Sequence, residues 1–103
     1  MSTALLDAVL HPPARLQIAA VLANVTEAEF ARLREITQVS DSVLSKHLAA
    51  LAEAGYVRLR KGPLDGRQRT WAAFTGKGQK AFAGHMAALR ALVESAEQAV
   101  AAE

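Results

Sequence analysis

Hydrophobic side chains recur at helical spacing between residues 40 and 54. Leu44, Leu48 and Leu51 are four and then three residues apart, so they share one face of a helix. Ser40 is a favourable N-cap, and Gly55 permits the left-handed backbone that ends many helices. The opposite face is small and polar, and it carries Asp41, Ser42, Ser45, Lys46 and Ala49. We therefore expect a helix with one face packed in a core and the other exposed.

Three shorter helices are predicted before it. The first covers Ser2 to Leu10 and ends where two prolines follow, because proline cannot continue an upstream helix. The second runs from about residue 13 to 23. Thr26 and Glu29 fit a capping box, which would start the third helix at Glu27. The inward positions are Leu16, Ala19, Ala20 and Leu22 in the second helix and Phe30, Leu33 and Ile36 in the third.

A basic hairpin is predicted after Gly55. Hydrophobic and polar residues alternate in residues 56–60 and again in 69–74, which is typical of strands. Residues 62–66 are dense in turn-forming glycine, proline and aspartate, so they are expected to join the two strands. Trp71 alternates with smaller neighbours on the second strand and is expected to pack in the core.

The last predicted helix begins after Thr75, which can cap it, and extends to about Ala101. Its apolar positions alternate steps of four and three and form a heptad seam, made of Phe82, Met86, Leu89, Val93, Ala96 and Val100. Such a seam packs against another helix, either within one chain or in a second copy. We favour a homodimer, because a helix of roughly 40 Å would extend beyond a three-helix core. The first helix would join this interface through Leu5, Leu6, Val9 and Leu10.

Length and residue usage narrow the class of protein. The chain has 103 residues and no cysteine, which suits a single domain over residues 1–103 and excludes disulfides and thiolate metal sites. No apolar run approaches the roughly 20 residues that cross a bilayer, and the N-terminus lacks a signal-peptide pattern. We expect a cytoplasmic protein that does not associate with membranes.

The charge distribution changes this picture more than the net charge of +2. Between Arg58 and Lys80 there are seven Lys or Arg residues and one acid, Asp65, which gives this block a net charge of +6 and leaves −4 on the rest of the chain. Such a block is typical of proteins that bind polyanions, although a charge run is more often a solvated face. Asp65 is expected to pair with Arg67 or Arg69 and to order the loop.

The order of elements predicts a fold class. Three helices, a fourth with an exposed polar face, a basic hairpin and a long final helix indicate a mainly α fold with a small β-hairpin wing (α+β), the winged helix-turn-helix. Residues 12–75 would form its core, and residues 1–10 and 76–102 would form dimerisation helices. In this fold the fourth helix enters the major groove of DNA and the wing reaches the minor groove. Small donors and acceptors near the start of the fourth helix can read base edges there, namely Ser40, Ser42, Ser45 and Lys46.

Two segments carry a family resemblance. "PPARLQIAAVLA" resembles the opening of ArsR-type regulators, and "VSDSVLSKHLAALAEAGYVRLRKGPLDGRQRTWAAFTGKGQKAF" resembles the recognition helix, the wing and the start of the next helix in compact MarR/ArsR-like winged-helix regulators. The resemblance covers residues 12 to 83 and implies a dimeric, sequence-specific transcriptional regulator. It also implies that bases and phosphates are contacted by Ser42, Ser45, Lys46 and His47, with Arg67, Gln68 and Arg69 at the wing tip.

One departure from that family is Gln38, where glycine is usual in the turn between the two helices of the motif. If the turn requires a positive φ, Gln38 would carry a strain of about 1–2 kcal/mol.

The sequence allows two interpretations of the role of His47 and of Arg15. His47 either contacts a phosphate or packs half-buried on the flank of its helix. Arg15 either touches a phosphate or forms an ion pair on the surface or at a helix end. The three histidines His11, His47 and His85 lie far apart without a carboxylate at a recurring ligand spacing, so we expect no metal site and no cofactor. A small-molecule effector is compatible with the resemblance, but no residue indicates a particular ligand.

These observations predict a homodimeric regulator of transcription that binds double-stranded DNA, with residues 40–54 in the major groove and residues 61–69 in the minor groove. Contacts to phosphates and to the minor groove would come from Lys46, Lys61, Arg67 and Arg69. The alternative is a winged-helix module for protein association, in which the basic hairpin binds an acidic partner. An enzyme is not expected, because the sequence has no Ser/His/Asp order, no paired carboxylates and no phosphate-binding glycine loop.

Overall fold

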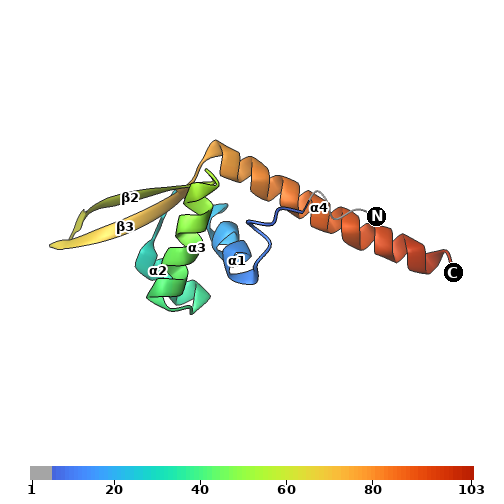
Figure 1. The fold of residues 1–103 in the computed structure, drawn as a ribbon, viewed down its shortest axis with the longest axis horizontal. Coiled ribbons are helices and arrows are strands. Elements are labelled where there is room, and N and C mark those ends of the chain that lie inside the picture. The colour runs from blue at the N-terminus through green and yellow to red at the C-terminus, as the bar shows by residue number, and fades with distance from the viewer. Residues whose placement is uncertain (1–5) are drawn as a thin grey trace.

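Four helices and a three-stranded antiparallel sheet form the part of the chain that the computed structural model describes, residues 6–103 (Figure 1). In chain order the elements are α1 (Pro13–Leu22), β1 (Ala28–Glu29), α2 (Phe30–Thr37), α3 (Asp41–Glu53), β2 (Val57–Leu64), β3 (Arg67–Phe74) and α4 (Gly76–Ala101). The strand order is β1-β3-β2. The predicted fold class, a winged helix-turn-helix with a long C-terminal helix, is confirmed.

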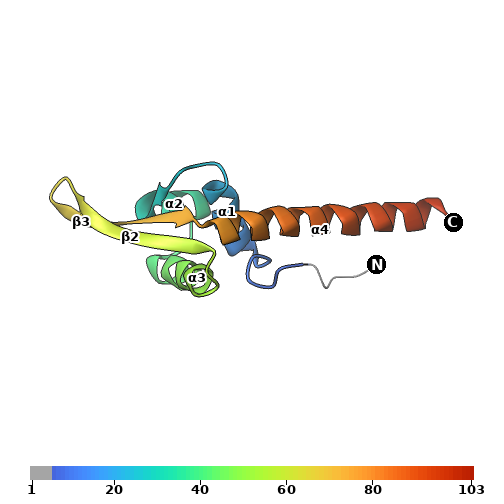
Figure 2. The ribbon, with the colours of Figure 1, turned by 90° about the horizontal axis from the view of Figure 1, so that it is seen from above.

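The molecule is elongated, with principal extents of 63 × 26 × 20 Å. Figure 2 shows that the β2–β3 hairpin and α4 extend in opposite directions from a body made of α1, α2 and α3. Because α4 leaves the body early, its only buried residues are Gly78 and His85. Within residues 6–103, no helix combines the length and the apolar character needed to span a membrane.

The core lies between α1, α2, α3 and the base of the hairpin. Leu44, Leu48 and Leu51 of α3 are buried, as their spacing predicted. The prediction for α1 was partly wrong, because Ile18 is buried with Ala19 and Leu22, whereas Leu16 is half-buried and Ala20 is exposed. The other large core residues are Leu10, Leu33, Val57 and Phe74.

The prediction of a helix from Ser2 to Leu10 is wrong for the second half of that segment. Residues 1–5 lie outside the described part of the chain, and residues 6–10 form a turn. The reason is the Asp7 carboxylate, whose Oδ1 accepts hydrogen bonds from the amides of Val9 (2.8 Å) and Leu10 (3.2 Å). An aspartate that binds nearby amides offers the backbone an alternative to a helix.

The predicted capping box of Thr26 and Glu29 is wrong. Ala28 and Glu29 instead form β1, which pairs with β3 through Ala28↔Ala72 and Glu29↔Trp71. Helix α2 therefore begins three residues later than expected, at Phe30, and Glu29 makes no side-chain cap hydrogen bond. Pairing with a distant strand has overridden the local helix signal.

The hairpin is longer than predicted, and its connection is shorter. Gly62 and Pro63 belong to β2, and the turn consists of Asp65 and Gly66 alone, with φ values of 52° and 75°. Two successive positive φ angles favour an Asp-Gly pair in a two-residue hairpin turn. Asp65 takes part in none of the ion pairs found within residues 6–103, so the predicted pairing with Arg67 or Arg69 is wrong.

The two long helices begin at the predicted caps. The Ser40 hydroxyl accepts a hydrogen bond from the Val43 amide (3.2 Å), and the Thr75 hydroxyl accepts one from the Gly78 amide (3.0 Å). Gly55 follows α3 with a φ of 81°. Local side-chain chemistry thus fixes both helix starts, and the position of α3 is what exposes the candidate site.

Candidate nucleic-acid interface

The outer face of α3 is exposed and polar. Ser42, Ser45 and Lys46 project from the side opposite the buried leucines, and all three are exposed. The short turn before α3 places its first residues at the surface, because Gln38 adopts a left-handed conformation (φ 57°, ψ 27°) that ends α2. The start of α3 is therefore free to meet a partner.

Ser40 caps α3 in the structure. Its hydroxyl oxygen accepts the Val43 amide and lies 3.2 Å from the Ser42 hydroxyl. The ion pair of Arg34 with Asp41 (2.8 Å) crosses from α2 to the first turn of α3 and compensates the one acid on this surface of α3. The helix start is thus fixed by short-range hydrogen bonds.

One face of the wing lies beside the outer face of α3. A small hollow of about 210 Å³ separates them, lined by Ser45 and Ala49 of α3 and by Lys61 and Thr70 of the hairpin. Lys61 and Thr70 are cross-strand partners, so they lie on the same face of the sheet. Gln68, two positions before Thr70 on β3, is exposed on the continuation of this face.

The other face of the wing carries arginines that are already paired. Arg60 lies over the Trp71 ring (4.2 Å to the centroid) and bonds to Glu27 (2.7 Å), and Arg69 bonds to Glu29 (2.6 Å). Trp71 is half-buried under Arg60 rather than packed in the core, so that prediction was wrong. Alternation along β3 explains this, because Ala72 takes the core side and Trp71 the opposite side.

Arg69 is therefore held within the chain. Its side chain is 28% exposed, and the hydrogen bond that it donates to Glu29 raises the pKa of its guanidinium above the usual value. The four ion pairs among the described residues involve Arg32, Arg34, Arg60 and Arg69. They leave out Lys46, Lys61 and Arg67, which are all exposed. Of the exposed cations outside these ion pairs, Lys46 lies on α3, Lys61 on the adjacent wing face and Arg67 at the wing tip, whereas the others lie at the base of the wing and on α4, namely Arg58, Lys77, Lys80 and Arg90.

His47 occupies the half-buried position that was one of its two predicted readings. Its Nδ1 accepts a hydrogen bond from Nε of Arg15 (3.0 Å). Burial and the Arg15 charge lower the pKa of His47 below its usual 6.5. Arg15 also donates to the Val9 carbonyl (3.4 Å), so it bonds inside the chain rather than forming the surface ion pair that we considered.

The predicted seam of α4 divides into two parts. Phe82 packs against Phe74 of the core, with ring centroids 6.1 Å apart, and Leu10 is 0% exposed in the same core. Leu10 therefore has no surface to offer a second chain, which corrects its assignment to the dimer interface. Val93 and Val100 are 54% and 69% exposed.

The rest of the predicted interface is partly covered. Leu6, Val9, Met86 and Leu89 are half-buried and Ala96 is exposed, whereas Leu5 lies outside the described residues. Val9 packs against the core of its own chain. The face that remains open thus runs from Met86 toward the end of α4, where two shallow grooves follow the seam.

Comparison with known sequences decides the family. Residues 14–93 match a sequence family described as a winged helix DNA-binding domain. The chain belongs to this family. A relative of this winged helix protein, an uncharacterized protein of Methanocaldococcus jannaschii, is 37% identical over 68 residues, which are 66% of this chain and 74% of that protein.

Solved structures of transcriptional regulators share the winged helix fold. The transcriptional regulator homologue of Pyrococcus horikoshii superposes with a TM-score of 0.80 and 25% identity, over 86% of this chain and 88% of that one. NadR in complex with 4-hydroxyphenylacetate superposes with a TM-score of 0.70 and 19% identity, over 93% of this chain and 67% of that one. The family match and the shared fold confirm the resemblance to winged-helix regulators that the sequence indicated.

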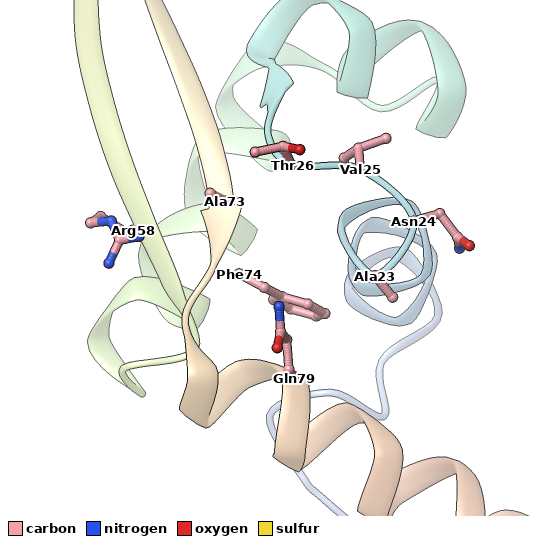
Figure 3. A pocket seen from close by; sticks show the side chains of 8 residues that line it. All are labelled: Ala23, Asn24, Val25, Thr26, Arg58, Ala73, Phe74 and Gln79. Atoms are coloured by element: carbon pink, nitrogen blue, oxygen red, sulfur yellow. The ribbon is translucent and has the colours of Figure 1, made fainter.

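An open pocket lies on another side of the winged helix domain. Figure 3 shows the loop after α1, the base of the wing and the first turn of α4 around it, with the Phe74 ring directed toward Ala23. Its volume is about 720 Å³, and Arg58 is the one charged residue among those that line it. No residue of α3 lines it, and it shares no lining residue with the hollow between α3 and the wing.

The structure also joins two histidines that are far apart in the sequence. His11 Nδ1 and His85 Nε2 are 3.4 Å apart, and the His85 Nδ1 accepts the Asp7 amide (2.9 Å). Within residues 6–103, no three histidine or acidic side chains are arranged to hold a metal ion. No periodicity or spacing could reveal this contact, because it depends on how residues 6–12 cross α4.

Proposed function

We propose that this winged helix protein is a homodimeric transcriptional regulator that binds double-stranded DNA sequence-specifically. In this proposal α3 enters the major groove and the tip of the wing enters the adjacent minor groove. Ser42 and Ser45 contact base edges, because a hydroxyl both donates and accepts hydrogen bonds. Lys46 and Lys61 contact phosphates, and Arg67 and the neighbouring Gln68 reach the minor groove.

The observation that carries the proposal is the position of two exposed lysines that form no ion pair among the described residues. On one face of the wing, glutamates near β1 neutralise Arg60 and Arg69. Lys46 and Lys61 belong to no ion pair in the described part of the chain, and they flank the exposed serines of α3. Positive charge beside a small polar helix face is what a phosphate backbone and an adjacent groove require.

The same geometry divides the predicted site residues by role. Ser40 caps α3, His47 is held by Arg15, and Arg69 fixes the wing against β1. In the proposal these three residues position the surface and do not contact DNA. The positions assigned to contact are Ser42, Ser45, Lys46, Lys61, Arg67 and Gln68.

The dimer is proposed to form along α4. The exposed apolar side chains of Val93 and Val100, together with Ala96 between them, continue a heptad seam beyond the body of the molecule. Two-fold pairing of such seams buries them and places the two α3 helices in successive major grooves about 34 Å apart. The bound DNA should therefore have two half-sites in inverted orientation.

Selection of bound duplexes from a random pool tests this proposal, and a motif with two-fold symmetry is expected. Affinity for that motif is then measured at several salt concentrations for the wild type and for Lys61→Ala/Arg67→Ala. Each lost phosphate contact reduces the slope of log affinity against log salt by about 0.9, and a dimer loses each contact twice. Loss of affinity with a shallower slope is expected.

Lys80→Ala is the matched control, because Lys80 is an exposed cation on α4 outside the surface of α3 and the wing. Its affinity and salt slope should equal those of the wild type. An unchanged slope in the double variant would remove the wing from the mechanism. Weak binding to every duplex, without a selected motif, would favour a module for protein association instead.

A further inference from the structure

In all three histidines of the chain, Nδ1 lies within hydrogen-bond distance of another nitrogen atom. His85 Nδ1 accepts the Asp7 amide (2.9 Å), and His47 Nδ1 accepts Nε–H of Arg15 (3.0 Å). His11 Nδ1 lies 3.4 Å from His85 Nε2. A backbone amide and an arginine Nε–H can only donate, so His85 and His47 must be unprotonated at Nδ1.

This requirement also fixes where the remaining protons lie. A neutral His85 with a free Nδ1 carries its proton on Nε2, which then donates to Nδ1 of His11. The two rings meet edge to face, with centroids 5.3 Å apart. A second proton on His85 would direct an N–H at the Asp7 amide, and a second proton on His47 would direct one at Arg15.

These histidines hold one segment, residues 6–12, which we call the N-terminal strap. On one side the strap bonds to α4, through Asp7 and His85. On the other side the Val9 carbonyl accepts a hydrogen bond from Arg15, which in turn donates to His47 on α3. A continuous set of hydrogen bonds therefore connects the long helix to the helix with the exposed serines.

The surroundings of His85 oppose its protonation. His85 is 1% exposed, and burial lowers its pKa first, with the neighbouring His11 adding to that effect and the charge of Asp7 partly opposing it. The Asp7 carboxylate is already bound by the Tyr56 hydroxyl (2.5 Å) and by the amides of the strap. Lys77 lies over the Tyr56 ring, 5.7 Å from its centroid.

We propose that the N-terminal strap is an acid-sensitive latch between α4 and α3. Protonation of His85 and His47 turns two hydrogen-bond acceptors into donors that face donors, and the strap is released. The core loses the cover of Leu10, and α4 loses its hydrogen-bonded connection to α3 through the strap. The effect on DNA rests on the function proposed above, because a released strap no longer fixes the orientation of the two α3 helices in a dimer.

The direction of the pH dependence follows from linkage. In the unfolded chain a histidine titrates near 6.5, and the pKa values of His85 and His47 are lower than this in the folded chain. The unfolded state therefore binds more protons as the pH falls below about 6.5. The stabilisation by these histidines is complete above that pH and is lost progressively below it.

Nitrogen-detected NMR of the histidine rings tests the first step. At pH 7.5, His85 and His47 should be Nε2–H tautomers. Protection of the Asp7 amide from hydrogen exchange, corrected for intrinsic rates, should fall at least tenfold between pH 7.5 and pH 5.5. At both pH values it should be lower than the protection of Ala72 in β3, because the strap is released without unfolding of the core. Nδ1–H tautomers, or equal protection of Asp7 at both pH values, would overturn the latch.

Two variants test the cause. In His85→Asn and His47→Asn the amide oxygen takes the place of Nδ1 and accepts at any pH, so each should reduce the pH dependence of Asp7 protection. If His85→Asn does not fold, His47→Asn and the wild-type tautomers still decide. Variants with the same pH dependence as the wild type would refute the assignment to these histidines.

DNA binding provides the second readout. The affinity of the wild type for its selected duplex should fall between pH 7.5 and pH 5.5, although added positive charge alone would strengthen binding. The fall should be smaller in His47→Asn. Strap release without loss of affinity would overturn the latch, whereas absence of specific binding at both pH values would refute the proposed function and leave the exchange result to decide on the strap.

Discussion

Gln38 shows how one residue sets the angle between two helices. It adopts φ 57°, and its amide still donates to the Arg34 carbonyl at 2.8 Å. The turn before α3 needs this left-handed backbone, which costs a residue with a Cβ about 1–2 kcal/mol. The strain is retained because the core leucines of α3 fix where that helix must begin.

Replacing Gln38 by glycine should stabilise the chain. Gln38→Gly removes the left-handed strain but adds backbone entropy to the unfolded state, so the expected gain in unfolding free energy is about 0.5–1 kcal/mol. Urea denaturation measures it. Gln17→Gly in the interior of α1 is the comparison and should lose about 1 kcal/mol. A lower unfolding free energy in both variants would contradict the proposed backbone strain at Gln38.

Replacement by alanine should change the stability of the chain in opposite directions at two glycines of α4. A Cβ at Gly78 would overlap the Tyr56 carbonyl oxygen and crowd Phe74, whereas a Cβ at Gly84 would meet nothing within 4 Å. Gly78→Ala should therefore destabilise the chain by about 1–3 kcal/mol or more. Gly84→Ala should stabilise it by about 0.5–1 kcal/mol. Thermal unfolding of both variants under one set of conditions checks the difference in sign.

At the scale of elements, local signals decided which ones could be predicted. The two long helices carry their caps and periodic leucines or seam residues within the sequence of each helix. β1 has only two residues and no periodicity, so only its pairing with β3 defines it. Because Glu27 and Glu29 were assigned to a helix, their pairing with arginines of the wing could not be foreseen. The sequence therefore could not indicate that Arg69 is bound to Glu29.

Two caps that look alike in the sequence should therefore behave differently. Ser40→Ala removes the acceptor for the Val43 amide and should cost about 1 kcal/mol of stability. Thr26→Ala should be nearly neutral, because Thr26 is exposed and precedes β1 rather than a helix. Chemical denaturation of both variants distinguishes the cases, and an equal loss at Thr26 would restore the capping box.

At the scale of the whole molecule, the sequence predicted the long helix and its seam but not which part of the seam the chain covers itself. Phe82 and Leu10 pack in the core of their own chain, because residues 6–12 cross α4 near His85. This crossing joins residues 74 positions apart in the sequence through His11 and His85, and no local pattern encodes it.

The exposed part of the seam gives a test of the dimer. Val93→Glu places a charge on the seam and should dissociate the dimer and weaken DNA binding, since two linked half-sites are lost. Ala91→Glu places the same charge on an exposed position of α4 outside the seam and should change neither. Sedimentation velocity measures the assembly state. A Val93→Glu variant that remains dimeric would move the interface elsewhere.

A single residue, Thr75, stands between β3 and α4. Its amide donates to the Tyr56 carbonyl (3.0 Å), and its hydroxyl donates to the Gly55 carbonyl (2.6 Å). The hairpin and the long helix thus project in opposite directions from one residue that is anchored to the end of α3 (Figure 2). A slight tilt imposed at the far end of the helix would swing the Asp65-Gly66 tip at the other extremity, with no hinge loop between them to absorb the movement.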